Sequence, residues 1–235
     1  MTEPTFPPLM QGQAVQPGID PFAKACAQAA LGCDAGTVVY VIDRNWLRAA
    51  LVLAPDVPLE DAVAMLPLCG TGFQNALGAL APPEVAVHLE WDGQIRVNGA
   101  RCGAFRMASD IDDPQQQPHW LVVGLDLPLW PDSDTPGGHT PEDTALLAEG
   151  CADVEPVALL ESWSRHTLAH INRWADEGVE PLHRDWRGLA WGIGEDTTMF
   201  GQSGTFLGID EKFGMLLRTD DTTDLIPLTR VLEKS

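Results

Sequence analysis

The chain has 235 residues, enough for one large hydrophobic core or for one large domain with a small one, and 45% of them are hydrophobic. Its 34 acidic and 14 basic residues give a formal charge of −20 at pH 7, whereas a surface that follows nucleic-acid phosphates needs the opposite sign. No stretch approaches the roughly 18 apolar residues of a membrane-spanning helix. We therefore expect neither a nucleic-acid partner nor a membrane partner.

The N-terminus and the cysteines bear on the cellular compartment. Residues 1–16 have neither the basic stretch nor the apolar stretch of a secretory signal. The five cysteines are an odd number and include no Cys-x-x-Cys pair. Reduced thiols in a cytoplasmic protein are therefore a better interpretation than a disulfide framework or a zinc site.

The first third of the chain predicts an extended arm, a short helix, two strands and a long helix, over residues 1–19, 20–32, 37–42, 47–54 and 59–80. Proline disfavours helix in the arm, whereas Asp20 followed by Pro21 is typical of a helix start. The β-branched and apolar composition of the two runs predicts buried strands. The long helix is expected to bend at Pro67 and Gly70.

The middle of the chain predicts short strands joined by tight turns, over residues 85–91, 95–97, 102–107 and 120–125. Asp92-Gly93 and Asn98-Gly99 are typical hairpin turns, which indicates antiparallel pairing. No GxGxxG or GxxxxGK[ST] motif occurs to suggest a nucleotide-binding loop. The Pro-, Gly- and Asp-rich stretch 128–150 is expected to be a long loop.

The last third changes from helical spacing to strand-like spacing. An amphipathic helix is expected over 156–177 and a second helix over 181–191, followed by three short strands at 206–209, 215–218 and 225–228. Trp186 and Trp191 are expected to pack these helices against the strands.

The sequence thus predicts an α+β fold with two parts. Residues 1–198 form a mixed, largely antiparallel sheet flanked by helices, and residues 199–235 form a small β-barrel-like module.

Two groups of side chains are of the types that bind metal ions, but neither has the spacing of a metal site. His166 and His170 are four residues apart, without an intervening glutamate or an identifiable third ligand. The aspartates within 110–113 and 132–134 lack the spacing of a calcium-binding loop. We therefore interpret the histidines as a solvated or capping pair and the aspartates as exposed loop carboxylates, and expect no metal site.

Lysine usage limits the chemistry. The only lysines are Lys24, Lys212 and Lys234, so no residue between 25 and 211 can act as a catalytic ammonium. Serine, histidine and aspartate residues are too scattered to indicate a catalytic triad, and no GxSxG motif occurs. Arg44 and Arg48, beside a strand end, are weak evidence for an anion-binding site.

Four segments in the right order resemble the biotin/lipoate protein ligase family. VHLEWDGQIRVNGARCGAFR (87–106) resembles its hairpin, in which Lys-Trp-Pro-Asn-Asp, a strand and Asn-Gly precede a lysine and small residues. WLVVGLDLPL (120–129) resembles the strand that ends Gly-Ile-Gly-Ile-Asn-Val. Residues 159–188 resemble the family's helices, and residues 204–232 its small, SH3-like C-terminal module.

The resemblance covers nearly the whole chain and implies a ligase-like α+β core. The enzymes of this family activate biotin with ATP as an acyl-adenylate and transfer it to a lysine of a carrier protein. By resemblance, the implied ligands are biotin, lipoate or ATP, and the implied partner is a carrier-protein domain.

The residues at the family's catalytic positions differ in this chain. Alignment on Trp91 and Asn98-Gly99 places Glu90 at the family's first lysine, Gln94 at its aspartate and Arg101 at its catalytic lysine. Arginine keeps the charge of lysine but not its compact, rotatable ammonium.

The later strand and the adenylate-binding loop differ as well. Asp126 and Pro128 replace the family's glycine and asparagine, and residues 42–46 pass directly into the next strand where the family has an Arg- and Gly-rich loop. Ordinary ATP-dependent biotinylation is therefore not expected.

We expect a pocket between the hairpin and the later strand that binds a small acyl, carboxylate or adenylate-type ligand. Arg101 is the expected catalytic-position residue and anchor for the ligand's carboxylate or phosphate, and Trp91 is an expected wall of the pocket. The remaining candidate ligand-binding residues are Gln94, Asn98, Gly99, Cys102, Gly103, Gly124, Asp126, Arg44 and Trp46.

Several alternatives remain open. Trp91 would otherwise be a core aromatic residue and Arg101 a surface charge of the hairpin. A regular strand would place Arg101 toward the cleft, and Ala100, Cys102 and Ala104 on the other face. The protein as a whole would otherwise be a non-catalytic interaction protein that docks a carrier domain by strand-edge pairing.

Overall fold

A seven-stranded sheet and a smaller four-stranded sheet form the framework of the computed structural model, which describes residues 3–131, 142–220 and 222–233. The strands of the large sheet are β1 (Gln11–Ala14), β2 (Thr37–Ile42), β3 (Trp46–Leu53), β4 (Val87–Leu89), β5 (Gln94–Val97), β6 (Ala100–Ser109) and β7 (Leu121–Pro128). Their order is β1-β2-β3-β7-β6-β5-β4, and every neighbouring pair is antiparallel except β1 with β2. The predicted α+β class with a mixed, largely antiparallel sheet is confirmed.

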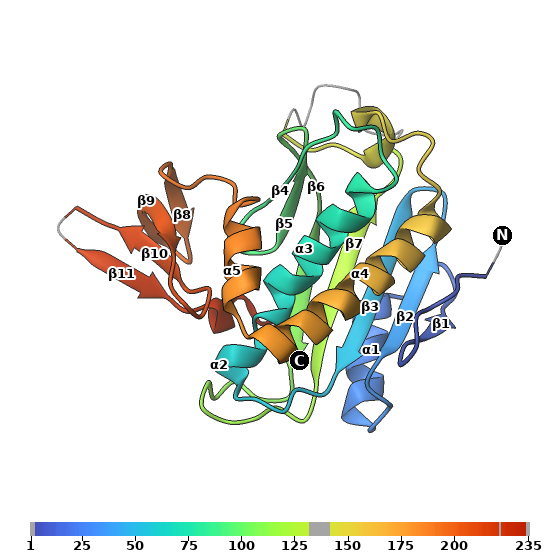
Figure 1. Ribbon diagram of the computed structural model, residues 1–235, viewed down its shortest axis with the longest axis horizontal. Coiled ribbons are helices and arrows are strands. Elements are labelled where there is room, and N and C mark those ends of the chain that lie inside the picture. Colours follow the sequence, from blue (N-terminus) through green and yellow to red (C-terminus); the bar gives the residue numbers. More distant parts are fainter. Residues whose placement is uncertain (1–2, 132–141, 221, 234–235) are drawn as a thin grey trace.

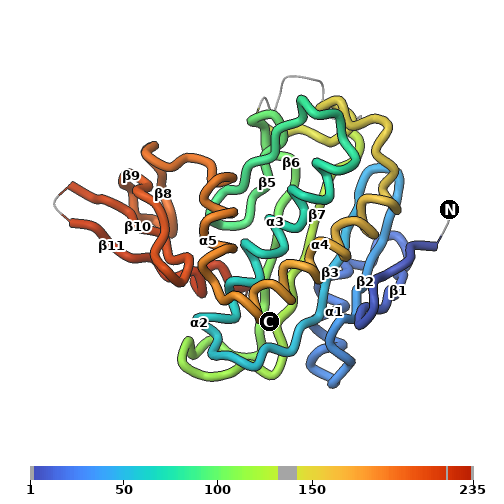
Figure 2. The backbone as a smooth tube through the Cα atoms, viewed as in Figure 1, coloured from blue at the N-terminus to red at the C-terminus, as the bar shows by residue number. Residues whose placement is uncertain are grey.

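The small C-terminal sheet is antiparallel and has the order β11-β10-β9-β8. Its strands are β8 (Asp196–Met199), β9 (Gln202–Ile209), β10 (Met215–Arg218) and β11 (Thr223–Ile226). Figures 1 and 2 show this sheet beyond helix α5 (Glu180–Arg187), on the side of the large sheet where β4 and β5 lie. The predicted C-terminal β-module is confirmed, with four strands instead of three.

Helices cover both faces of the large sheet (Figure 1). On one face lie α3 (Met65–Gly78) and α4 (Pro156–Glu177), and on the other lies α1 (Pro21–Ala30). The remaining helical segments are α2 (Leu59–Ala62) and two short 3-10 turns, Leu146–Glu149 and Leu228–Val231. Among the residues that the structure describes, no helix is long and apolar enough to cross a membrane.

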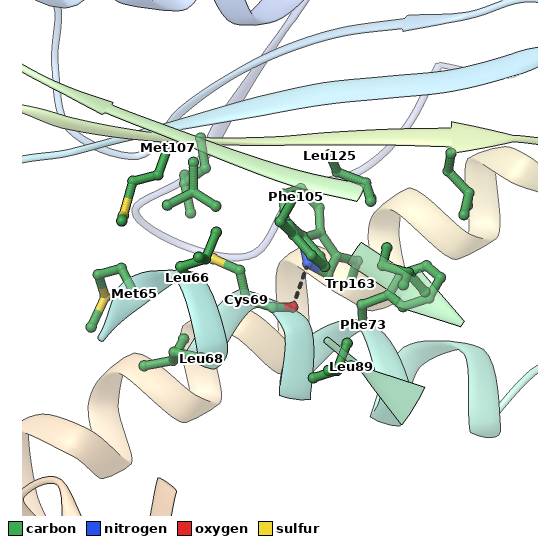
Figure 3. Packing of buried hydrophobic residues seen from close by; sticks show 14 of the residues in the cluster. Met65, Leu66, Leu68, Cys69, Phe73, Leu89, Phe105, Met107, Leu125 and Trp163 are labelled. Carbon is green, nitrogen blue, oxygen red and sulfur yellow. Dashed lines mark hydrogen bonds between the residues drawn. The ribbon is translucent and has the colours of Figure 1, made fainter. Parts of the chain in front are cut away.

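The main core lies between the sheet and the pair α3/α4 (Figure 3). Trp163 of α4 is buried there, and its indole Nε1 donates a hydrogen bond to the carbonyl oxygen of Cys69 on α3 at 3.1 Å. The helices approach closely at Gly72, where a Cβ atom would lie 2.8 Å from Oγ1 of Thr167. Close helix packing of this kind requires a small residue at the contact.

Two strands and one helix interruption differ from the sequence prediction. Strand β1 pairs with β2 inside the predicted arm, and β8 was not predicted, because both strands are polar and largely exposed and show no apolar alternation. The long helix is interrupted at residues 63–64 instead of bending at Pro67 and Gly70. Pro67 is the third residue of α3, where the missing N–H has no intrahelical acceptor to lose.

The two sheets are joined by aromatic side chains. Trp91 is 3% exposed, and its Nε1 donates a hydrogen bond of 2.7 Å to the carbonyl oxygen of Phe213 in the C-terminal part. Trp186 packs edge-on against the ring of Phe213, as predicted. The prediction for Trp191 is wrong: its ring packs under the guanidinium of Arg96, with 4.7 Å from the guanidinium carbon to the ring centroid.

We expect Trp91→Phe to lower the free energy of unfolding by about 1–3 kcal/mol, because the buried carbonyl of Phe213 then loses this donor. Urea denaturation of the full chain measures the effect. The matched control, Trp191→Phe at a half-buried position, is expected to change stability by less than about 1 kcal/mol. Equal losses in the two variants would contradict the assigned role of the hydrogen bond.

Candidate functional site

The face of the large sheet that carries α1 is only partly covered by that helix. Phe22 of α1 packs on Gly124 of β7, where a Cβ atom would lie 2.5 Å from Cδ2 of Phe22. Beyond this contact, side chains on β3, β5, β6 and β7 that point away from the main core are partly exposed and mostly charged. We call this surface the polar face; its residues are Trp46, Arg48, Arg96, Arg101, Ala104, Arg106 and Asp126.

Strand alternation brings the charged residues of the polar face together. Leu47 and Leu127 point into the main core, so their neighbours Arg48 and Asp126 point to the opposite side. Arg48 is directly opposite Asp126 in the β3–β7 register, and Asp126 is directly opposite Ala104 in the β7–β6 register.

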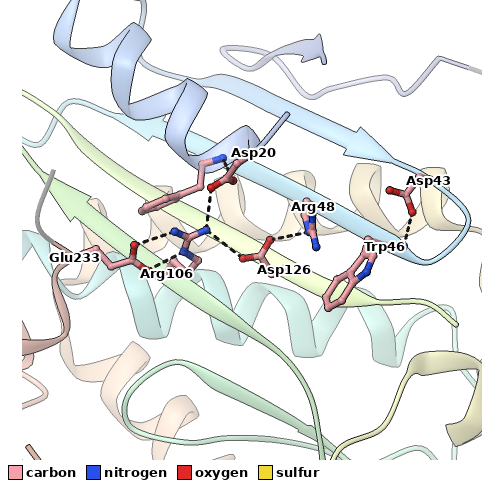
Figure 4. Close-up of polar contacts among 8 residues, drawn as sticks. Asp20, Asp43, Trp46, Arg48, Arg106, Asp126 and Glu233 are labelled. Atoms are coloured by element: carbon pink, nitrogen blue, oxygen red, sulfur yellow. Dashed lines mark hydrogen bonds and ion pairs between the residues drawn. The ribbon is translucent and has the colours of Figure 1, made fainter. Parts of the chain in front are cut away.

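Asp126 is the centre of an ion-pair network (Figure 4). Its Oδ1 lies 3.4 Å from Nε of Arg48, and its Oδ2 lies 3.5 Å from Nη1 of Arg106. Burial raises the pKa of the Asp126 carboxyl although two guanidinium groups act in the opposite direction. The two arginines therefore offset part of the effect of burial on this carboxylate.

Arg106 has two further carboxylate partners. Its Nη1 lies 3.3 Å from Oδ2 of Asp20, the N-cap residue of α1. Its Nε and Nη2 donate to the two carboxylate oxygens of Glu233 at 2.8 and 2.9 Å, a bidentate pair (Figure 4). The hydrogen bond with Glu233 is the main reason that the pKa of Arg106 is raised.

Arg101 lies at the other end of the polar face. Its Nε donates to Oε1 of Glu90 at 3.2 Å, and its Nη1 lies 3.6 Å from Oε2 of Glu142. The same Glu90 oxygen accepts from Nε of Arg96 at 2.6 Å. The hydrogen bond with Glu90 raises the pKa of Arg101, whose side chain is 41% exposed. Glu90, which the sequence comparison places at a lysine position, thus holds two arginines.

A bulge at Gly103 changes the expected alternation of β6. Gln94 and Arg96, two residues apart on β5, pair with Ala104 and Arg101, three residues apart on β6. Gly103 has φ +88°, and a Cβ atom there would lie 2.2 Å from the carbonyl oxygen of Asp126. The expectation that Cys102 and Ala104 share one face is therefore wrong: Cys102 points into the main core and Ala104 to the polar face.

The structure does not place Trp91 and Cys102 beside Arg101 on the polar face. Both belong to the main core, with exposed fractions of 3% and 0%. The expectation that Trp91 and Arg101 line one cleft is not met, and the alternative of a core aromatic residue describes Trp91. Trp46 does lie on the polar face, with the guanidinium carbon of Arg48 4.5 Å from its ring centroid.

The remaining candidate residues lie in turns of the sheet or beside the polar face. Asn98 and Gly99 form the β5–β6 turn, and Oδ1 of Asn98 accepts a hydrogen bond from N of Ala86 at 3.0 Å. Arg44 is in the β2–β3 turn, with its guanidinium carbon 5.8 Å from the Trp130 ring centroid. The half-buried Gln94 lies opposite Ala104.

Sequence reasoning missed five charged residues that belong to the polar face or contact it: Asp20, Arg96, Arg106, Glu142 and Glu233. The alternation of Arg96 with Ile95 and Val97 is a usable signal. The bulge shifts the alternation of β6, so the sequence pattern does not predict the face on which Arg106 lies. No local pattern connects Arg106 with Asp20 or Glu233.

The histidine pair is part of helix packing. Asn75 of α3 donates from Nδ2 to Nε2 of His170 at 2.8 Å, and burial lowers the pKa values of both His166 and His170. Within the described ranges, no group of three or more His, Cys, Asp or Glu side chains is arranged to hold a metal ion. Asp132 and Asp134 lie outside the described residues.

We expect Arg101→Ala to change the free energy of unfolding by less than about 1 kcal/mol, because Arg101 is exposed and Glu90 keeps Arg96 as a partner. The matched variant Arg96→Ala removes a side chain that is 12% exposed and is expected to cost about 2 kcal/mol. Thermal and urea unfolding measure both. A larger loss of stability in Arg101→Ala than in Arg96→Ala would show that Arg101, and not Arg96, is the more important partner of Glu90 for folding.

Comparison with known proteins identifies the family. The family model described as "Biotin/lipoate A/B protein ligase family" matches residues 6–188, and one described as "Domain of unknown function (DUF4444)" matches residues 193–234. No curated protein matches the chain.

Solved structures include a similar protein and others with the same fold. A biotin protein ligase-like protein of unknown function from Silicibacter sp. TM1040 is 65% identical, with a TM-score of 0.94 over 99% of this chain and 100% of that chain. The biotin protein ligase from Aquifex aeolicus is 16% identical, with a TM-score of 0.72 over 94% and 96% of the two chains. The Leishmania major enzyme in complex with biotinyl-5-AMP is 15% identical, with a TM-score of 0.57 over 94% and 99%. The chain belongs to the biotin/lipoate A/B protein ligase family.

Proposed function

We propose that this protein is a divergent ligase-family member that binds a small carboxylate, acyl or adenylate-type ligand on the polar face and does not catalyse ordinary ATP-dependent biotinylation. One observation carries the proposal. Arg101, at the position that the resemblance gives to the catalytic lysine, is exposed on this face but is paired with Glu90 and Glu142. Arg101 thus keeps a positive charge at this position, and the carboxylates of Glu90 and Glu142 balance that charge.

Ligand binding is supported by the relatives and by the shape of the sheet. Structures of the Aquifex aeolicus enzyme include a complex with biotin and ATP, and the Leishmania major enzyme has been solved with biotinyl-5-AMP. In the present chain, α1 leaves Arg48, Asp126 and Arg101 partly exposed on one side of the sheet. Convergent polar groups on a rigid sheet are typical of a binding site.

Two features argue against adenylation. The β2–β3 connection is a short turn between Ile42 and Trp46. The Asp43 carboxylate closes this turn by accepting hydrogen bonds from N of Asn45 and N of Trp46 at 2.8 and 2.9 Å. Such a turn leaves no room for an Arg- and Gly-rich loop. Five carboxylates, those of Asp20, Glu90, Asp126, Glu142 and Glu233, also contact the arginines of the polar face. A triphosphate would approach these negative charges.

We expect at least one of biotin, lipoate, ATP and biotinyl-adenylate to raise the melting temperature, and Arg101→Ala to abolish that shift while leaving the apo value nearly unchanged. A ligand at a hundred times its dissociation constant adds about 2.7 kcal/mol. Thermal-shift measurements on the full chain test this. Arg184→Ala, at a 70% exposed arginine outside the polar face, is the matched control. Failure of every ligand would favour the alternative, a non-catalytic protein that docks a carrier domain.

We also expect no biotin-dependent release of pyrophosphate from ATP, because residues 25–211 contain no lysine and the Arg- and Gly-rich loop is missing. The assay uses the purified full chain, with an active biotin protein ligase measured in parallel. Release above the rate found with ATP alone would show that adenylation survives in this chain.

A further inference from the structure

A hollow lies beside α1, at the end of β6 that is away from Arg101. Its volume is about 920 Å³, which is within the range of small-molecule sites. Residues of α1, of β6 and of the segment before β7 line it together with Glu233. It meets the polar face at Arg106, which belongs to both.

The surface of the hollow is largely apolar. On α1, Ala23, Ala27 and Ala30 present methyl groups that are exposed, and the rings of Phe22 and Trp120 complete this lining. The thiol of Cys26 also lines the hollow, and burial raises its pKa to about 11, so it is neutral at physiological pH. The hollow therefore suits a hydrocarbon or aromatic body.

A carboxylate already occupies the polar end of the hollow. The Glu233 side chain binds the Arg106 guanidinium through two parallel hydrogen bonds of 2.8 and 2.9 Å, the geometry that guanidinium groups use to bind carboxylates. Glu233 is placed there by a hydrogen bond from its backbone N to the carbonyl oxygen of Met107 at 2.8 Å. The other polar pair on the rim, His119 with Asp110, has an Nδ1–Oδ2 distance of 2.6 Å.

We propose that this hollow is a binding site for a small monocarboxylate with an apolar body, and that Glu233 occupies the carboxylate position in the free protein. The ligand's carboxylate replaces that of Glu233 on Arg106, and its hydrocarbon part lies along the alanines of α1. The C-terminal segment thus acts as an internal competitor that sets the affinity of the site.

The charges around Arg106 favour a monocarboxylate over a phosphate. Exchange of one carboxylate for another leaves the balance between Arg106 and its partners Asp20 and Asp126 unchanged. A phosphate dianion would add a second negative charge beside these two carboxylates. This site does not depend on Arg101, so it goes beyond the function proposed above.

Calorimetric titration of the full chain with decanoate tests the proposal. We expect binding to the unmodified protein and about tenfold tighter binding to Glu233→Ala, because the internal competitor is removed. Ala27→Trp fills the hollow from an exposed helix position and is expected to weaken binding at least about tenfold. Acetate, which has the charge without the apolar body, is expected to bind far more weakly.

A control variant and a second readout test this assignment. Arg184→Ala, at a 70% exposed arginine outside both the hollow and the polar face, is expected to leave decanoate affinity within about twofold of the unmodified protein. Amide hydrogen exchange gives an independent readout: saturation with decanoate is expected to speed exchange of the Glu233 N–H, which loses its place at Met107.

Several results would overturn the proposal. Equal decanoate affinity in Ala27→Trp would place the ligand outside the hollow, and unchanged affinity in Glu233→Ala would show that Glu233 is no competitor. Loss of decanoate binding in Arg101→Ala would move the site to the polar face. Absence of binding to Glu233→Ala at millimolar decanoate would refute the hollow as a carboxylate site, whatever the outcome with biotin or adenylates.

Discussion

The contact between Phe22 and Gly124 decides which part of the large sheet remains open. Any side chain at position 124 would collide with the Phe22 ring, so the hydrogen atom of glycine lets α1 lie directly on β7. The position of α1 then fixes its N-cap, Asp20, within 3.3 Å of Arg106, whose guanidinium carbon lies 4.3 Å from the Phe22 ring centroid. Partly exposed surface remains on both sides of this contact because the helix covers only a strip of the sheet.

The charged groups on the open part of the sheet balance one another. Arg48, Arg96, Arg101 and Arg106 each have a carboxylate oxygen within 4 Å. In a chain with a net charge of −20, these pairs prevent the arginines from acting as a free positive patch. An anion that approached these arginines would compete with the resident carboxylates for the same guanidinium groups.

The fold was largely predictable because its main elements have strong hydrophobic patterns. The strand over 37–42 and the helix over 156–177 have the predicted bounds, since each combines a clear apolar period with a clear start and end. Strands β1 and β8 could not be predicted in this way, because polar edge strands are defined by their partners and not by their own composition.

The arrangement of the polar face was less predictable for two physical reasons. A single extra residue at Gly103 reverses the alternation of β6, so Arg106 points to the face that a regular strand would not give it. Asp20 and Glu233 reach Arg106 from opposite ends of the chain, and no local period encodes such a contact. Arg101 could be located from the Asn98-Gly99 turn, but its neutralisation by Glu142 could not.

The hydrogen bond between Trp91 and Phe213 has a mechanical consequence. Trp91 follows Glu90 directly in the chain, and Glu90 holds Arg96 and Arg101. A rigid rotation of the four-stranded sheet about α5 would have to break this hydrogen bond or move the turn between β4 and β5, where Trp91 lies. A displacement of the small sheet is therefore coupled through Trp91 to Glu90, and so to the ion pair between Glu90 and Arg101.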